Sequence, residues 1–144
     1  MKKLDYSLVF VCGLIEHIGR QKKLPREEVI EIMGSNLLKN YYEYADVFHC
    51  MSLEDNLSEL EEQLTFPQGD YINHLDSMFK VPSEYQVGKV YTMIIQELFD
   101  DPIDGIYKLY NSFLAKLIND YNTHTIFTPI DELVLSYKEG ILIE

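Results

Sequence analysis

Asp70, His74 and Asp76 are the residues whose types and spacing come nearest to a chemical site. Carboxylates beside an imidazole serve as metal ligands and as acid–base groups. On a short helix, Asp70 and His74 would lie one turn apart. However, no HExxH pattern, second nearby histidine or cysteine ligand accompanies them. The sequence therefore predicts a surface histidine near two carboxylates, and not a metal or catalytic site.

Residues 100–105 partly match a calcium-binding loop, with acidic residues at its first and fifth positions and glycine at its sixth. The match fails at the third position, Pro102, and at the twelfth, Asn111, where a bidentate glutamate is needed. Asp101 followed by Pro102 is also a typical helix start. Gly88-Lys89 lacks the upstream glycine of a phosphate-binding loop. We therefore expect no catalytic residues, no metal and no cofactor, and we expect that the protein is not an enzyme.

Charge is distributed unevenly along the chain. The 144 residues include 24 acidic and 12 basic side chains, which gives a net charge of −12. Residues 1–50 hold 7 of each sign, so residues 51–144 carry the whole surplus. Such a field repels nucleic acid and anionic membranes and attracts basic molecules. We expect a protein partner with a basic surface, and no direct contact with nucleic acid or membrane.

Two neighbouring segments are candidates for binding that partner. Residues 54–62 hold five carboxylates and no basic residue, and a leucine seam at residues 53, 57, 60 and 64 would turn them towards solvent. Three tyrosines occupy residues 41–44 and cannot all face one core stripe, so we expect Tyr42 to point outward. The alternative is a solvated helix face beside core-edge tyrosines. The candidate partner-binding residues are Tyr41, Tyr42, Tyr44, Glu54, Asp55, Glu59, Glu61 and Glu62.

These residues must be positioned by helices, because helical spacing dominates the sequence. We predict an all-α fold, a compact bundle of seven or eight short-to-medium helices in a single domain, 1–144. A turn at residues 66–70 would divide it into halves 1–66 and 70–144. Residues 110, 113, 114 and 117 would be buried on the longest helix. The expected helices cover about residues 5–20, 25–34, 36–48, 52–64, 71–79, 83–99, 101–121 and 129–140.

The location of the protein is inferred from its cysteines and its apolar segments. Cys12 and Cys50 lie in apolar surroundings, and we expect both to be small buried side chains, which suits a reducing compartment. The apolar run at residues 8–15 is too short to cross a bilayer and has no cleavage site after it. We expect a cytoplasmic protein.

Residues 6–64 resemble a family of small bacterial proteins known only as a domain of unknown function. The resemblance lies in Phe10-Val11-Cys12 with Ile15-Glu16, in Leu24-Pro25 with Glu28-Val29, and in the aromatic segment 42–49 that ends in a histidine. The family usually has leucine where Phe48 precedes that histidine. Its genes often lie beside a gene for an ADP-ribosyltransferase-like toxin. The resemblance therefore implies an antitoxin-like or regulatory role, and it carries over no catalytic residue.

Together these observations favour a non-enzymatic protein–protein interaction module, antitoxin-like or inhibitor-like, whose acidic helical surface blocks a basic site on its partner. One alternative is a phage-encoded inhibitor that mimics the charge of nucleic acid and occupies a host nuclease. Others are a small enzyme using Asp70, His74 and nearby tyrosines, and a homodimer or larger scaffold built on the leucine seam.

Overall fold

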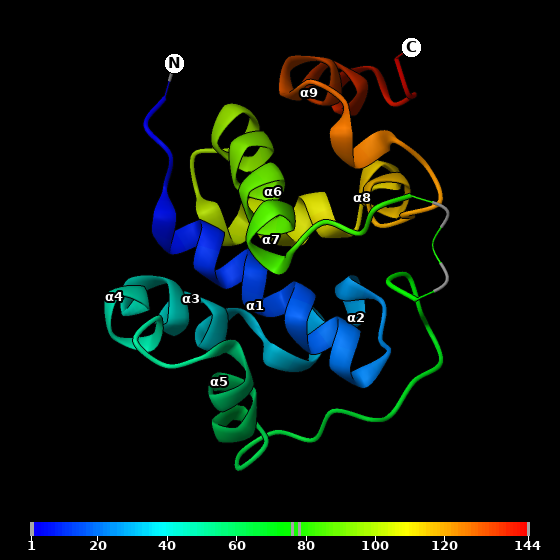
Figure 1. The fold of residues 1–144 in the computed structure, drawn as a ribbon. Coiled ribbons are helices and arrows are strands. Elements are labelled where there is room, and N and C mark those ends of the chain that lie inside the picture. Colours follow the sequence, from blue (N-terminus) through cyan, green and yellow to red (C-terminus); the bar gives the residue numbers. More distant parts are fainter. Residues whose placement is uncertain (1, 76, 78, 144) are drawn as a thin grey trace.

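The computed structural model describes residues 2–75, 77 and 79–143, and all regular structure in these residues is helical. The predicted all-α class is confirmed. The described residues form nine α-helices and one 3-10 helix (Figure 1): α1 (Tyr6–Lys22), α2 (Arg26–Met33), α3 (Ser35–Glu43), α4 (Ala45–Phe48), α5 (Leu53–Leu60), α6 (Glu84–Leu98), α7 (Pro102–Tyr110), α8 (Phe113–Ile118), η1 (Thr125–Phe127) and α9 (Ile130–Glu139).

The first helix, α1, runs through the middle of the molecule. Figure 1 shows α2–α5 below it and α6–α9 above it. From Leu8 to Gly19, every residue except Phe10 is buried. One hydrophobic core surrounds this helix and draws on residues from both ends of the chain. The two halves of the sequence therefore share a single interior.

The most extensive helix–helix contact joins α1 to α6, and glycine lets the two backbones approach closely. A Cβ atom on residue 88 would lie 2.5 Å from the carbonyl oxygen of Val9 and 2.9 Å from the nitrogen of Gly13. Only glycine leaves room for two helix backbones at this separation. The contact brings the first turn of α6, which begins at Glu84, against the second half of α1.

Most helices begin within one or two residues of the predicted starts. The Asp5 carboxylate accepts a hydrogen bond from the Leu8 amide at 3.2 Å and caps α1. Ser83 and Gln86 form a complete capping box at the start of α6. The Asp101 carboxylate caps α7 and accepts from the Ile103 amide at 3.0 Å. Residues 100–105 are thus a capped helix start, as the sequence predicted.

The helix predicted over residues 101–121 is two helices, α7 and α8. Ser112 is extended between them, its hydroxyl donates to the Leu109 carbonyl at 2.6 Å, and it accepts from the Ala115 amide. Serine competes with helical hydrogen bonds in this way, and here it ends one helix and caps the next. As a result Leu114 is buried as predicted, whereas Phe113 is only half-buried. Of the other residues expected in the core, Tyr110 is buried and Leu117 is half-buried.

The helix predicted at residues 71–79 is absent from the described part of that segment; Asp76 and Met78 lie outside the described residues. The backbone bonds to distant parts of the chain instead. The Gly69 amide donates to the Lys22 carbonyl at 2.8 Å, and the Tyr71 amide donates to the Lys23 carbonyl at 2.9 Å. These contacts satisfy backbone amides in the connection and backbone carbonyls at the C-terminal end of α1.

Two further predictions were wrong. The helix expected at residues 36–48 is divided at Tyr44, whose backbone angles (φ −111°, ψ 26°) leave the helical range. Cys50, in the turn after α4, is exposed, while Cys12 is fully buried as expected. No described helix is both long and apolar enough to span a membrane.

Candidate functional site

The acidic helix α5 lies as the sequence predicted. Ser52 caps it by accepting a hydrogen bond from the Asp55 amide at 3.0 Å, and Leu57 and Leu60 face the core. The leucine seam is therefore used inside the chain's own core. The exposed carboxylates of this helix and its C-terminal turn are Glu54, Asp55, Glu59, Glu61 and Glu62.

The three candidate tyrosines have three different environments. Tyr41 is buried and stacks on Phe48, with ring centroids 4.1 Å apart. Tyr42 is half-buried, and its hydroxyl donates to the Asp5 carboxylate at 2.5 Å. Burial, with the Asp5 carboxylate, raises the pKa of Tyr42 to about 12. Tyr44 is 55% exposed.

The prediction that Tyr42 points outward was therefore wrong, and Tyr44 is the exposed tyrosine instead. The helical period does not continue through Tyr44, because α3 ends at Glu43 and the backbone turns there before α4 begins. The Asp5 carboxylate, which also caps α1, holds Tyr42 inward. Of the three tyrosines, Tyr44 alone offers most of its ring to a partner.

Sequence reasoning missed two exposed residues on α4, Val47 and Asp46. Val47 is 62% exposed, and its apolar side chain lies one helical turn after Tyr44. The Asn56 side chain joins α4 to α5, because its amide nitrogen donates to the carbonyls of Phe48 and Ser52, each at 3.0 Å. We call the exposed residues of this unit the acidic–aromatic surface: Tyr44, Asp46, Val47, Glu54, Asp55, Glu59, Glu61 and Glu62.

Asp70 and His74 do not share a helical turn, since this segment is not helical. Asp70 is exposed and His74 is half-buried; Asp76, the third residue of the predicted cluster, lies outside the described residues. Burial, followed by the charges of Arg20 and Arg26, lowers the pKa of His74. In the part of the chain that the structure describes, no three His, Cys, Asp or Glu side chains are arranged to hold a metal ion.

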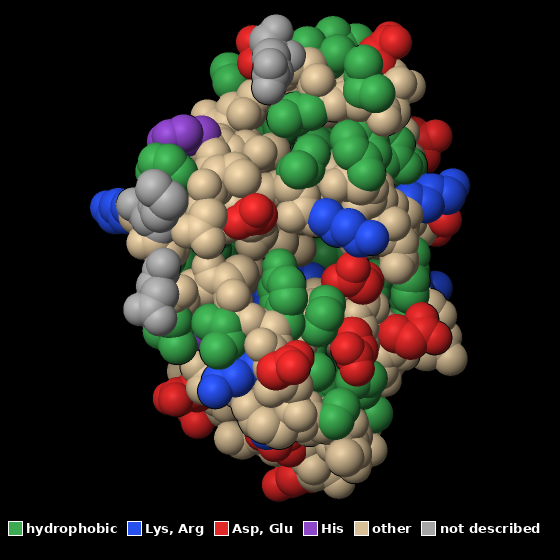
Figure 2. Space-filling model, turned by 90° about the vertical axis from the view of Figure 1, so that its right-hand side faces the viewer, with side chains coloured by type: hydrophobic (Ala, Val, Ile, Leu, Met, Phe, Trp, Pro, Cys, Tyr) green, Lys and Arg blue, Asp and Glu red, His purple; other side chains and the backbone are tan. Residues whose placement is uncertain are grey.

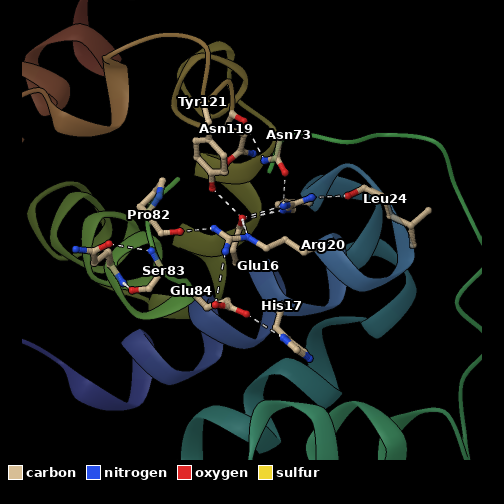
Figure 3. Close-up of polar contacts among 12 residues, drawn as sticks. Glu16, His17, Arg20, Leu24, Asn73, Pro82, Ser83, Glu84, Asn119 and Tyr121 are labelled. Atoms are coloured by element: carbon tan, nitrogen blue, oxygen red, sulfur yellow. Dashed lines mark hydrogen bonds and ion pairs between the residues drawn. The ribbon is translucent and has the colours of Figure 1, made fainter. Parts of the chain in front are cut away.

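A buried polar network lies at the centre of the molecule, and the sequence analysis did not identify it (Figure 3). The fully buried Glu16 carboxylate accepts two hydrogen bonds from Arg26, from Nε and Nη2, each at 2.8 Å. It accepts a third from Arg20 Nε at 2.7 Å and a fourth from the Tyr121 hydroxyl at 2.8 Å. Burial alone would raise the pKa of Glu16, but the two arginines outweigh it and lower that pKa.

The network also fixes the long connection between α5 and α6. The Arg26 guanidinium donates to the Asn73 side chain at 2.9 Å, and Asn73 in turn donates to the Asn119 carbonyl at 3.0 Å. Arg20 Nη2 donates to the Pro82 carbonyl at 2.6 Å. Gly19 leaves the space that Arg26 fills, since a Cβ there would lie 2.5 Å from its guanidinium.

At its edge the network reaches the first turn of α6. His17 Nδ1 lies 3.0 Å from the Glu84 carboxylate, and Arg20 Nη1 lies 3.6 Å from it. The hydrogen bond from His17, with the charge of Arg20, lowers the pKa of Glu84 to about 2.

This network is suited to holding elements together rather than to chemistry. Both oxygens of the Glu16 carboxylate accept hydrogen bonds, Oε1 from Arg26 and Oε2 from Arg26, Arg20 and Tyr121. It ties α1 to α2, to the connection at Asn73 and to the turn at Tyr121. The signal in the sequence was Glu16 itself, an ionisable residue within an otherwise buried helix and one turn before Arg20.

Comparisons with protein-family models, with curated proteins and with solved structures gave no match to this chain. The resemblance of residues 6–64 to the bacterial family therefore stays a hypothesis.

Proposed function

We propose that the protein is a non-enzymatic interaction module, antitoxin-like or inhibitor-like, that binds a basic surface of another protein through its acidic–aromatic surface. The observation that carries this proposal is the joining of α4 to α5 by Asn56. It fixes α4, which carries the exposed side chain of Val47 and follows Tyr44, against α5, which together with its C-terminal turn carries five exposed carboxylates.

The charges and the apolar side chains have different roles in this proposal. Carboxylates that stay hydrated contribute mainly to the rate of encounter with a basic partner. Aromatic and aliphatic side chains that become buried contribute most of the affinity. Of the five carboxylates, Glu61 makes an ion pair within the chain, with Lys22 at 2.7 Å, whereas Glu54, Glu59 and Glu62 make none with the described residues.

Acidic side chains are also exposed elsewhere on the molecule. The face seen in Figure 2, which is the right-hand side of Figure 1, carries acidic side chains in both its upper and its lower half. An acidic field of this extent favours a basic partner over nucleic acid or an anionic membrane.

The test is capture of the partner followed by kinetics. The tagged protein is used to isolate its partner, and association is then measured by surface plasmon resonance at several salt concentrations. Reversal of Glu54, Glu59 and Glu62 to lysine should slow association and reduce its salt dependence, with little change in dissociation.

The matched control reverses Glu97, Asp100 and Glu139, which are exposed and lie around α6 and α9, at the opposite end of the molecule from α5 (Figure 1). Both triple variants change the net charge equally, so a difference between their association rates would show that the position of the charges matters. Equal association rates for the two triple variants would refute the proposal.

The apolar part of the surface has its own test. Tyr44→Ala with Val47→Ala should speed dissociation about tenfold or more. Phe127→Ala, which removes another aromatic ring that is 55% exposed, should leave dissociation unchanged. Tyr42 is unsuitable for this purpose, since its hydroxyl bonds the Asp5 carboxylate that caps α1.

A further inference from the structure

A cavity beside the buried network is lined by several basic side chains, although the protein as a whole is acidic. It is open to solvent and has a volume of about 780 Å³. It lies where the connection between α5 and α6 meets the first two turns of α6. The lining residues that matter here are Arg20, His74, Lys80, Ser83, Tyr85 and Lys89.

The local charge is opposite to that of the whole molecule. Residues 51–144 contain only five basic side chains, and two of them, Lys80 and Lys89, line this cavity. Both are exposed, and neither makes an ion pair with any carboxylate among the described residues. No direct contact therefore neutralises their positive charges. At physiological ionic strength, salt screens the interaction between these lysines and acidic residues more than about 8 Å away.

Arg20 gives the cavity a fixed wall. Its side chain is only 10% exposed, and it is held by the Glu16 carboxylate at 2.7 Å and the Pro82 carbonyl at 2.6 Å. Since Glu16 and Glu84 balance its charge, Arg20 contributes shape and rigidity more than net charge. The excess charge comes from the two lysines.

A histidine and an aromatic ring complete the lining. The Nδ1 atom of His74 is buried and has no hydrogen-bond partner among the described residues. Tyr85 is 54% exposed and lies one helical turn before Lys89, on the same face of α6. A planar ligand group can stack on this exposed ring, while the two lysines neutralise the ligand's negative charge.

We propose that this cavity binds a small phosphate monoester whose ring stacks on Tyr85, with Lys80 and Lys89 contacting the phosphate. Ammonium groups on flexible stems are common phosphate ligands, acting as point charges. The proposal does not depend on the acidic–aromatic surface, because the two features share no residue.

The test is a titration of the isotope-labelled full chain with adenosine monophosphate at physiological ionic strength, followed by nuclear magnetic resonance. Saturable shifts should centre on residues 80–89. Adenosine without its phosphate should bind much more weakly, and ribose 5-phosphate should bind less tightly than adenosine monophosphate because it has no base to stack. Tyr85→Ala should remove that difference.

The decisive variant is Lys80→Gln with Lys89→Gln, which should weaken binding of adenosine monophosphate by about tenfold or more. Its matched control is Lys116→Gln with Lys138→Gln, which removes the same charge from two exposed lysines outside the cavity and should change affinity little. Both double variants change exposed side chains, and thermal unfolding followed by circular dichroism checks that they stay folded.

A second readout comes from His74. A bound phosphate places negative charge beside the imidazole and favours its protonated form, so the His74 resonance should titrate at higher pH with ligand than without it. The proposal would be overturned by no saturable binding up to about 10 mM ligand. Equal affinities of the two lysine double variants, or adenosine binding as tightly as its monophosphate, would also overturn it.

Discussion

The Glu16 carboxylate accepts four hydrogen bonds in the interior of the molecule. A carboxylate in a helix that is buried on all sides loses its hydration, and this loss is compensated only if its partners satisfy it fully. Here Arg26 and Arg20 supply opposite charge, and Tyr121 supplies a further donor. Removing one partner should therefore destabilise the fold by more than the intact ion pair stabilises it relative to apolar side chains of similar size.

Arg26→Ala should lower the free energy of unfolding by about 3–5 kcal/mol, because it leaves the Glu16 carboxylate buried beside an empty space. Urea denaturation followed by circular dichroism measures the loss. Lys22→Ala is the matched control, since it breaks the more exposed ion pair with Glu61 and should cost about 1 kcal/mol or less. A similar small cost for both variants would show that Glu16 is not dependent on Arg26.

Glu84 should make the stability of the protein depend on pH in the acidic range. Its pKa is about 2 in the folded state against 4.5 for an ordinary glutamate, so its contribution to stability is complete above pH 4.5 and is lost as pH falls towards 2. Compared with Glu84→Gln, the native chain should be clearly more stable at neutral pH. The difference should shrink between about pH 5 and about pH 3. Urea titrations of both proteins at several pH values measure it, and a constant difference would contradict the assignment.

Helix starts were predictable from the sequence, whereas breaks within a periodic apolar pattern were not. Asp5, Ser52, Ser83 and Asp101 cap helices through hydrogen bonds to residues two or three positions away, so the signal is local. Ser112 also caps locally, but the apolar period runs on across it and hides the break. Tyr44 interrupts the predicted third helix without any breaking residue.

The break at Ser112 predicts which of two substitutions on α8 destabilises the protein more. Leu114→Ala should cost about 2–5 kcal/mol, as expected for a fully buried leucine. Phe113→Ala removes a larger side chain but should cost less, because α8 turns this ring partly to solvent. A single unbroken helix over residues 101–121 would predict the reverse order. Thermal and urea unfolding of the two variants distinguishes these cases.

The connection between α5 and α6 could not be predicted in the same way. Its structure depends on contacts distant in sequence: Gly69 with Lys22, and Asn73 with Arg26 and Asn119. Local spacing instead suggested a helix at residues 71–79. The exposed carboxylates of α5 were predictable, since a leucine seam determines which side of a helix faces solvent. The buried network and the basic cavity were not, because each assembles from several elements.

For the whole molecule, a net charge of −12 means that the folded chain repels itself. Added salt screens this repulsion, so the unfolding temperature should rise by a few degrees between about 10 and 200 mM sodium chloride. Differential scanning calorimetry measures the rise. Reversing Glu54, Glu59 and Glu62 to lysine halves the net charge and should reduce the rise. An unfolding temperature that falls with salt in the native chain would show that internal ion pairs, and not repulsion, dominate.

The contrast between the two cysteines has a practical consequence for studying this protein. Cys12 is fully buried, and burial raises the pKa of its thiol to about 12, so it is almost entirely protonated and unreactive near neutral pH. Cys50 is exposed in the turn between α4 and α5. A maleimide dye should therefore attach to the native chain at one place, without mutagenesis, beside Val47 and the acidic helix. A fluorophore there would report docking of a partner on the acidic–aromatic surface and stay distant from the basic cavity at α6.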